Sequence, residues 1–159
     1  MAAARALGRL GDQKAVDALL NYLSRQLSRT MEHVAIYALV EIAGFEETAA
    51  GLVGSSSLAQ RRVLWALNGM SGSQLKAETV MKRLGSKHGS LSATAVSISK
   101  DHPEWAGSIA QTFQKWRRIG KLTENRLAAI KELAPLFLQS ESMRKFVGRL
   151  IASSDVTTN

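Results

Sequence analysis

The stretch DHPEW, which begins at Asp101, holds the densest group of side chains that could do chemistry. Asp101, His102 and Glu104 could form an acid–base site or contribute metal ligands. The same order of residues is also typical of a helix start, with Asp101 as the N-cap, Pro103 in the first turn and Glu104 reaching back to the cap amide. We therefore predict a capping box here, with Trp105 as a corner anchor and no catalytic role.

Motifs for metal binding and nucleophilic catalysis are missing from the rest of the sequence. His33, His88 and His102 form no i, i+4 pair and no HExxH motif. Neither a G-x-S-x-G motif nor a G-x-x-x-x-G-K-[ST] loop occurs. The absence of cysteine excludes disulfides, thiolate zinc sites, iron–sulfur clusters and thiol nucleophiles within this segment. We expect a non-enzymatic protein with no catalytic, metal or cofactor site.

Basic residues form the best candidate for a functional surface. Residues 57–126 hold 12 Lys and Arg against 4 Asp and Glu, whereas residues 1–56 hold 5 against 6. Such a basic region can bind nucleic acid, an acidic protein or an anionic surface. Two clusters in it end predicted helices, where cations also complement the helix dipole. The candidate interaction surface comprises Lys82, Arg83, Lys87, Lys115, Arg117, Arg118 and Lys121.

The elements that carry these residues form an internal repeat. Five segments begin with Ala followed by an aliphatic residue: ALGRLGD (6–12), ALVEIAG (38–44), ALNGMSG (66–72), AVSISKD (95–101) and AIKELAP (129–135). Each precedes a second amphipathic run, at 15–23, 48–53, 75–84, 105–116 and 143–151. The sequence also predicts N-caps at Asp12, Ser57, Thr123 and Ser140, and helix stops at Gly44, Gly72, Gly85 and Gly120.

These patterns predict an all-α protein, an α-solenoid of about five helical-hairpin repeats in a single array over residues 1–159. We place the units at about 1–27, 28–55, 56–87, 88–120 and 121–154, followed by a disordered tail at 155–159. One unit cannot bury its own apolar stripe, so the units stack. Stacking would bring the basic helix ends to one electropositive edge.

A family resemblance supports the repeat. ARALGRLGDQKAVDALLNYL, residues 4–23, resembles the HEAT-like repeat of phycobilisome lyases through its A-L-G-x-L-G-D turn and A-V-x-x-L second helix. The resemblance implies HEAT-like repeats throughout, although the pattern weakens after the first unit. The consensus arginine six positions before the Ala is replaced by Glu32, Gln60, Gly89 and Thr123. The family's inter-repeat hydrogen-bond ladder is therefore not carried over to this chain.

A narrower resemblance covers more of the chain. The segments RTMEHVAIYALVEIAG (29–44), QRRVLWALNGM (60–70) and HPEWAG (102–107) are similar to the helical-repeat region of large multidomain bacterial proteins. In those proteins a sugar-dehydrogenase-like propeller precedes the HEAT array and a c-type cytochrome module follows it. The resemblance implies an exported redox parent protein with its chemistry outside the array. The uncapped first helix at 2–7 likewise predicts either a piece of a longer protein or chain ends that meet neighbouring domains.

The most direct functional expectation is a helical-repeat scaffold that binds another protein or neighbouring domains of the same chain. The alternative is nucleic-acid binding through the basic edge in residues 82–121, since some HEAT-like proteins are DNA glycosylases with basic, Trp-containing grooves. Trp116 shares an apolar stripe with Ile109 and Phe113, so we expect it in the core rather than as a base-stacking platform. No apolar run could span a membrane and no signal peptide is recognisable, which leaves the compartment open.

Overall fold

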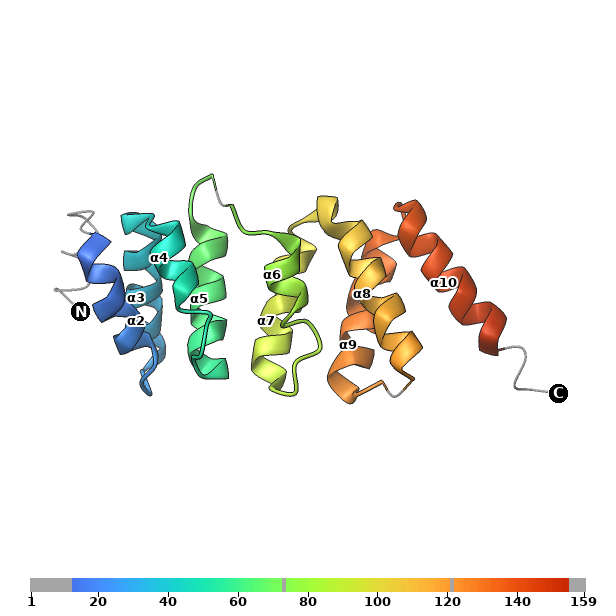
Figure 1. Cartoon of the computed structure of the whole chain (residues 1–159), viewed down its shortest axis with the longest axis horizontal. Coiled ribbons are helices and arrows are strands. Elements are labelled where there is room, and N and C mark those ends of the chain that lie inside the picture. Colours follow the sequence, from blue (N-terminus) through green and yellow to red (C-terminus); the bar gives the residue numbers. More distant parts are fainter. Residues whose placement is uncertain (1–12, 73, 121, 155–159) are drawn as a thin grey trace. The chain divides into compact units, whose positions relative to one another are not determined.

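The secondary structure is helical throughout the part of the chain that the computed structural model describes, residues 13–72, 74–120 and 122–154. These residues contain nine α-helices, three short 3-10 turns and no strand, which confirms the predicted all-α class (Figure 1). None of the described helices is long and apolar enough to cross a membrane. The α-helices are α2 (Val16–Leu23), α3 (Arg29–Ile42), α4 (Phe45–Ala50), α5 (Ser57–Gly69), α6 (Ala77–Met81), α7 (Gly89–Lys100), α8 (Ala106–Ile119), α9 (Glu124–Leu133) and α10 (Glu141–Ser154).

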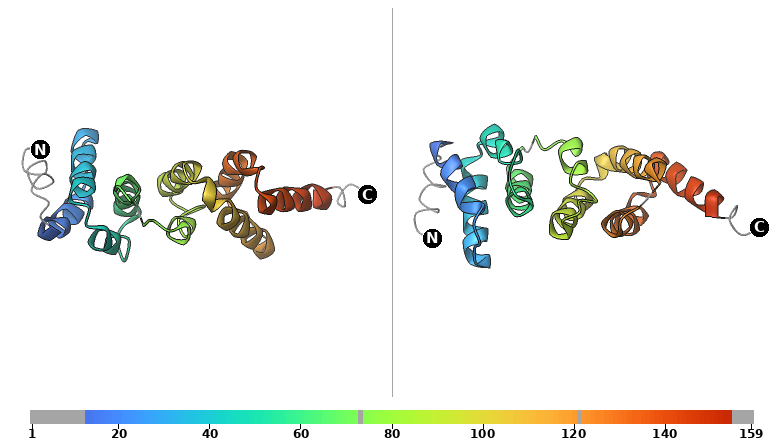
Figure 2. Two further views of the ribbon diagram at one scale, coloured as in Figure 1. Left: turned by 90° about the horizontal axis from the view of Figure 1, so that it is seen from above. Right: turned by 60° about the horizontal axis from the view of Figure 1, so that its bottom comes forward.

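The chain divides into two compact units, unit 1 (Met1–Leu75) and unit 2 (Lys76–Asn159). In unit 1, α2 packs on α4 and α3 packs on α5, while α2 also contacts α3 and α4 contacts α5. In unit 2, α8 packs on both α6 and α10, α7 packs on α9, and α6 contacts α7. Successive helices thus alternate between two layers within each unit, and Figure 2 shows the helices from two further directions. This alternation is the packing of stacked helical hairpins.

The helix positions follow the predicted repeat. The five predicted second-helix runs overlap α2, α4, α6, α8 and α10, with the smallest overlap at α4, and four of the first-helix segments lie at the ends of α3, α5, α7 and α9. The first such segment, at 6–12, lies outside the described residues, as do Asp12 and the tail at 155–159. The unit boundaries and the continuity of one array over both units stay predictions.

The small and branched residues of the repeat form the core. Ala38, Leu39, Ala66 and Leu67 are 0–1% exposed, so α3 and α5 approach each other over alanines while the leucines fill the space between layers. Burying one such leucine side chain contributes roughly 1.5–3 kcal/mol to the stability of the folded state. Aromatic residues take this role in unit 2, where Phe113 of α8 packs on Phe146 of α10 with ring centroids 5.5 Å apart.

The predicted helix starts are correct to within one residue. Ser56, not Ser57, is the N-cap of α5, and its hydroxyl accepts a hydrogen bond from the Ala59 amide (3.2 Å). The correction follows from chain geometry, because Ser56 has the extended backbone of a cap (φ −63°, ψ 157°) while Ser57 is already helical. Thr123 is the N-cap of α9 as predicted, and Ser140 directly precedes α10.

Of the four predicted glycine stops, only Gly120 is the C-cap of its helix, α8, whereas α5 and α6 end earlier, with C-caps at Met70 and Lys82. Gly72, Gly85 and Gly120 have φ of 65°, 71° and 92°, the left-handed region that favours glycine. Gly44 is not the stop of α3: Ala43 takes the left-handed position with φ 55° and ψ 24°, and Gly44 is the N-cap of α4. The short link between α3 and α4 therefore places a strained alanine where a glycine was expected.

Candidate interaction surfaces

The DHPEW corner is a turn between α7 and α8, but not the predicted capping box. Asp101 is the C-cap of α7, and its amide donates to the Ile98 carbonyl (3.1 Å). The chain breaks one residue later, at His102 (φ −124°, ψ 74°), because a residue before proline is disfavoured in the helical region. Pro103 then opens a single 3-10 turn, Pro103–Trp105, that leads into α8.

His102 and Glu104 interact with each other at this corner. The Nδ1 of His102 lies 2.6 Å from the Oε1 of Glu104. The His102 ring stacks on Trp105 with centroids 3.7 Å apart and an interplanar angle of 4°. The hydrogen bond from His102 lowers the pKa of the exposed Glu104 carboxyl. Trp105 is buried, in agreement with its predicted role as an anchor.

The structure places three of the predicted basic residues around one groove of unit 2. This basic groove has a volume of about 640 Å³ and lies between α6, α8, the start of α9 and the loop after α6. Its cations are Lys82, Lys87, Lys115 and Arg126, and Glu78 is its one carboxylate. Within the described residues none of these four cations forms an ion pair. The groove therefore presents unneutralised positive charge.

The floor of the basic groove is Trp116, which is 6% exposed. The guanidinium carbon of Arg126 lies 5.3 Å from the centre of the Trp116 ring, a cation–π arrangement. Trp116 also contacts Phe113, with ring centroids 5.4 Å apart. The prediction that Trp116 belongs to the core is confirmed, and the tryptophan offers no free face to a nucleotide base.

The loop that carries Lys87 is held in place by its neighbours. Gly85 has positive φ, and a Cβ there would lie 2.7 Å from the Arg126 side chain and 2.8 Å from the Trp116 ring. Its amide donates to the Ser92 hydroxyl (3.0 Å), and the Asn125 side-chain amide donates to the Ser86 carbonyl (2.7 Å). Glycine thus lets the backbone lie directly on the groove floor.

The other predicted basic residues do not join this groove. Arg117 and Arg118 line a smaller groove of about 210 Å³ between α8 and α10, together with Phe146 and Arg149. Arg83 is half-buried and donates to the Thr79 carbonyl (2.8 Å), and burial lowers its pKa. Lys121 lies outside the described residues. Instead of one edge, the described basic residues form two separate groups, because consecutive positions on α8 point to different sides of the helix.

Unit 1 carries a groove of a different kind between α3 and α5. This aromatic groove has a volume of about 730 Å³. Tyr37, 54% exposed, and Trp65 line it together with Ile36 and Val40. Gly69 lets α5 lie close to Val40 of α3 in this groove, since a Cβ there would lie 3.1 Å from Val40. The complete lining is Arg29, Thr30, Glu32, His33, Ile36, Tyr37, Val40, Trp65 and Gly69.

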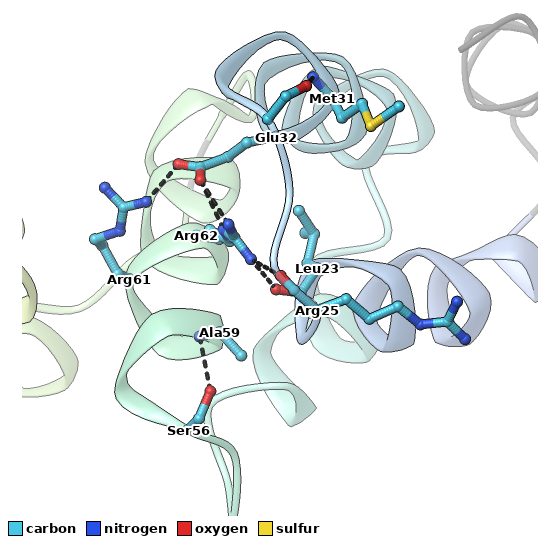
Figure 3. A network of polar contacts seen from close by, with 9 residues as sticks. Leu23, Arg25, Met31, Glu32, Ser56, Ala59, Arg61 and Arg62 are labelled. Atoms are coloured by element: carbon cyan, nitrogen blue, oxygen red, sulfur yellow. Dashed lines mark hydrogen bonds and ion pairs between the residues drawn. The ribbon is translucent and has the colours of Figure 1, made fainter.

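A buried arginine stands beside this groove and has a structural role (Figure 3). Arg62 of α5 is 2% exposed, and its Nη1 donates to the carbonyls of Leu23 (2.5 Å) and Arg25 (2.7 Å). Its Nε and Nη2 contact one oxygen of Glu32, at 2.9 and 2.8 Å. Arg61 reaches the other oxygen of Glu32 at 2.6 Å. The network joins the end of α2 to α3 and α5, three consecutive predicted repeats.

Sequence reasoning missed Arg62 and Arg126. The buried positions of α5 include Ala59, Val63 and Ala66, and Arg62 falls on the same i, i+3, i+4 stripe. A charged residue on an apolar stripe was the sequence signal for a buried, partnered arginine. Arg126 had no such signal, because it enters the groove from the following helix.

Groups of His, Asp and Glu that could hold a metal ion are absent from the described residues. The two grooves offer charge, hydrogen-bond donors and apolar surface.

Comparisons with known proteins bear on the repeat. A family model described as the PBS lyase HEAT-like repeat matches residues 1–25, which include all of α2. No curated protein and no solved structure gave a match. This match supports a HEAT-like repeat at residues 1–25, and the two-layer packing of helices in each unit is consistent with a helical-repeat solenoid.

Proposed function

We propose that this protein is a non-enzymatic scaffold that binds a segment of another polypeptide. The observation that carries the proposal is the aromatic groove between α3 and α5. Large apolar side chains exposed together mark interaction sites, and Tyr and Trp are enriched in protein interfaces because they combine a large rigid surface with a polar group. HEAT-like repeats suit this role, since their stacked helices provide an extended surface.

Site-specific photo-cross-linking tests the scaffold proposal. A benzophenone amino acid replaces Tyr37 in the aromatic groove, and the protein is irradiated in its own cells. The matched control carries the same group at Glu46, an exposed residue of α4 in the other helix layer of unit 1. We expect discrete cross-linked polypeptides from position 37 and none of these from position 46. Identical products from both positions, or no discrete product from position 37, would contradict the proposal.

We propose further that the array belongs to a longer bacterial redox protein and that the polypeptide bound is a neighbouring domain of that protein. This proposal is supported by the resemblance of segments 29–44, 60–70 and 102–107 to the repeat region of such proteins. The size of the polypeptide in its own cells tests it, through an immunoblot with an antibody against α8. A band far above 17.2 kDa is expected, and a band at 17.2 kDa would rule this proposal out.

A further inference from the structure

We infer that the basic groove of unit 2 binds a short acidic segment of a partner protein, and that this segment also carries an apolar side chain. The inference rests on the proposed function, because it names the chemistry of a partner for the scaffold. It is carried by the charge, the rigidity and the apolar rim of the groove.

The positive charge of the groove favours a ligand that carries carboxylates. Lys82, Lys87, Lys115 and Arg126 converge on one space with a single acidic residue, Glu78, and form no ion pair with the described residues. Arg126 is partly buried over Trp116, and its buried Nε has no hydrogen-bond partner among the described residues. A planar guanidinium can bind a carboxylate through paired N–H groups, so Arg126 suits an acidic ligand.

The groove is formed before any ligand arrives. The loop at 84–88 is tied to α7 through the Gly85 amide and to α9 through the Ser86 carbonyl. Gly85 rests on Trp116 and Arg126 with no room for a side chain. A ligand therefore meets a fixed backbone and orders few groups on binding, which reduces the entropic cost of association.

The rim of the groove is apolar as well as basic. Ile119, at the end of α8, is 61% exposed and lines the groove beside Lys115, and Met81 lines it from α6. Burying an exposed isoleucine against a partner is favourable, in proportion to the apolar area removed from water. An acidic segment with an apolar side chain would use both kinds of surface.

The same features disfavour nucleic acid as the ligand. Bases of single strands bind by stacking on exposed aromatic faces, whereas Trp116 is 6% exposed and lies against Arg126 and Gly85. A protein that binds a phosphate backbone places a row of cations along the strand, but Arg117 and Arg118 line a different groove from the lysines. The described cations thus favour a compact ligand over a long polyanion.

A peptide-binding measurement on the full chain tests the inference. The probe is a short fluorescent peptide that alternates Glu and Leu, compared with the same peptide carrying Gln for Glu or Ser for Leu, and with a single-stranded oligonucleotide. Lys115→Gln removes an exposed charge of the groove. Lys131→Gln, on the exposed surface of α9 and absent from the groove lining, is its matched control. Ile119→Ser tests the apolar rim.

We expect Lys115→Gln to weaken binding of the Glu-Leu peptide about tenfold, because it removes one charge-assisted contact. Lys131→Gln should leave the affinity within about twofold, since exposed charges outside the site contribute little. Ile119→Ser should weaken binding of the Glu-Leu peptide more than that of the Glu-Ser peptide. Arg126→Gln should resemble Lys115→Gln, with a circular dichroism melt to show that the variant folds.

Three results would overturn the inference. The first is that the Glu-Leu peptide does not bind. The second is that Lys115→Gln and Lys131→Gln weaken peptide binding equally. The third is that the protein binds the oligonucleotide and not the peptide, and that Lys115→Gln abolishes binding of the oligonucleotide. The last result would support the nucleic-acid alternative. Failure of the peptide with successful cross-linking from position 37 leaves the scaffold proposal standing. Failure of the cross-linking alone rejects the scaffold proposal and leaves the groove as an anion-binding site.

Discussion

The two units use the same two-layer packing of helices, but the arginines of α5 in unit 1 and the lysines of the basic groove in unit 2 have opposite roles. In unit 1, Arg61 and Arg62 of α5 both contact Glu32, and Arg62 also satisfies two backbone carbonyls. In unit 2, Lys82 and Lys115 line a groove without an ion-pair partner among the described residues. Arg61 and Arg62 in unit 1 thus hold helices together, while Lys82 and Lys115 in unit 2 are available to a ligand.

The difference shows that positive charge in a helical repeat has no fixed role. A buried cation must be partnered, because an uncompensated charge in the protein interior is costly. An exposed cation needs no partner and can be used for recognition. Burial therefore explains why Arg62 has a structural role in unit 1 while the lysines of the basic groove in unit 2 can bind a ligand. All of these residues lie on or next to amphipathic helices.

The largest effect is expected from the buried arginine. Arg62→Met leaves the carbonyls of Leu23 and Arg25 without their donor and removes one partner of Glu32. We expect a loss of about 3 kcal/mol in the free energy of unfolding, measured by urea titration with far-ultraviolet circular dichroism. The control, Arg61→Met, removes a more exposed partner of the same carboxylate and should cost about 1 kcal/mol or less. Equal losses would show that Arg62 is not the structural member of the pair.

A smaller loss is expected at the loop of the basic groove. Gly85→Ala adds a Cβ within 2.8 Å of Trp116 at a residue with φ 71°. Strain and displacement together should cost about 2 kcal/mol in the free energy of unfolding. Gly72→Ala is the matched control, because its φ is 65° but its Cβ would meet nothing within 4 Å. It should cost about 1 kcal/mol by the same titration, and a larger loss than at Gly85 would contradict the close packing of the loop.

A gain in stability is expected at the link after α3. Ala43→Gly relieves a left-handed alanine at the helix end, where glycine is preferred. The relief exceeds the extra entropy of glycine in the unfolded chain, so we expect a gain of about 0.5 kcal/mol. Ala128→Gly, at an exposed position inside α9 of unit 2, should instead lose about 1 kcal/mol. Calorimetric melting curves check both signs, and a loss at both positions would contradict the assigned backbone of Ala43.

The smallest effect is expected at the DHPEW corner. The His102 hydrogen bond lowers the pKa of Glu104. The ionised carboxylate therefore adds its full contribution to the stability of the fold above the ordinary carboxyl pKa of 4.5, and this contribution disappears as the pH falls through the lowered pKa. Glu104→Gln should therefore lower stability by no more than about 0.5 kcal/mol at neutral pH, since solvent screens the exposed pair. Melting curves of both proteins at neutral and acidic pH should converge in acid. A gap that widens in acid would contradict the assigned pair.

The fold was largely predictable because its signals are local. The positions of the nine described helices were predicted to within a few residues from Ala-aliphatic segments, amphipathic runs and glycines. Several misplaced features differ from the structure by one residue: Ser56 in place of Ser57, Ala43 in place of Gly44, and His102 in place of Asp101 as the break before α8. Neighbouring residues often have similar preferences for the cap position of a helix, so the packing of the helices decides which residue takes it.

The candidate site was only partly predictable. Lys82, Lys87 and Lys115 were identified because they cluster at the ends of helices. Arg126 was missed because only folding brings α9 beside the loop after α6, and Arg117 and Arg118 line a different groove from the lysines. Adjacent positions on a helix point about 100° apart, so neighbours in sequence need not share a surface.

The sequence by itself determined that the chain is a series of paired helices, because helix periodicity and end signals act over a few residues. Only the tertiary structure decided the use of each charge. Arg62 reaches Glu32, which lies 30 positions away, and Arg126 covers Trp116 from another helix. Such pairings depend on burial and on distances between helices, quantities that a residue's neighbours in sequence do not contain.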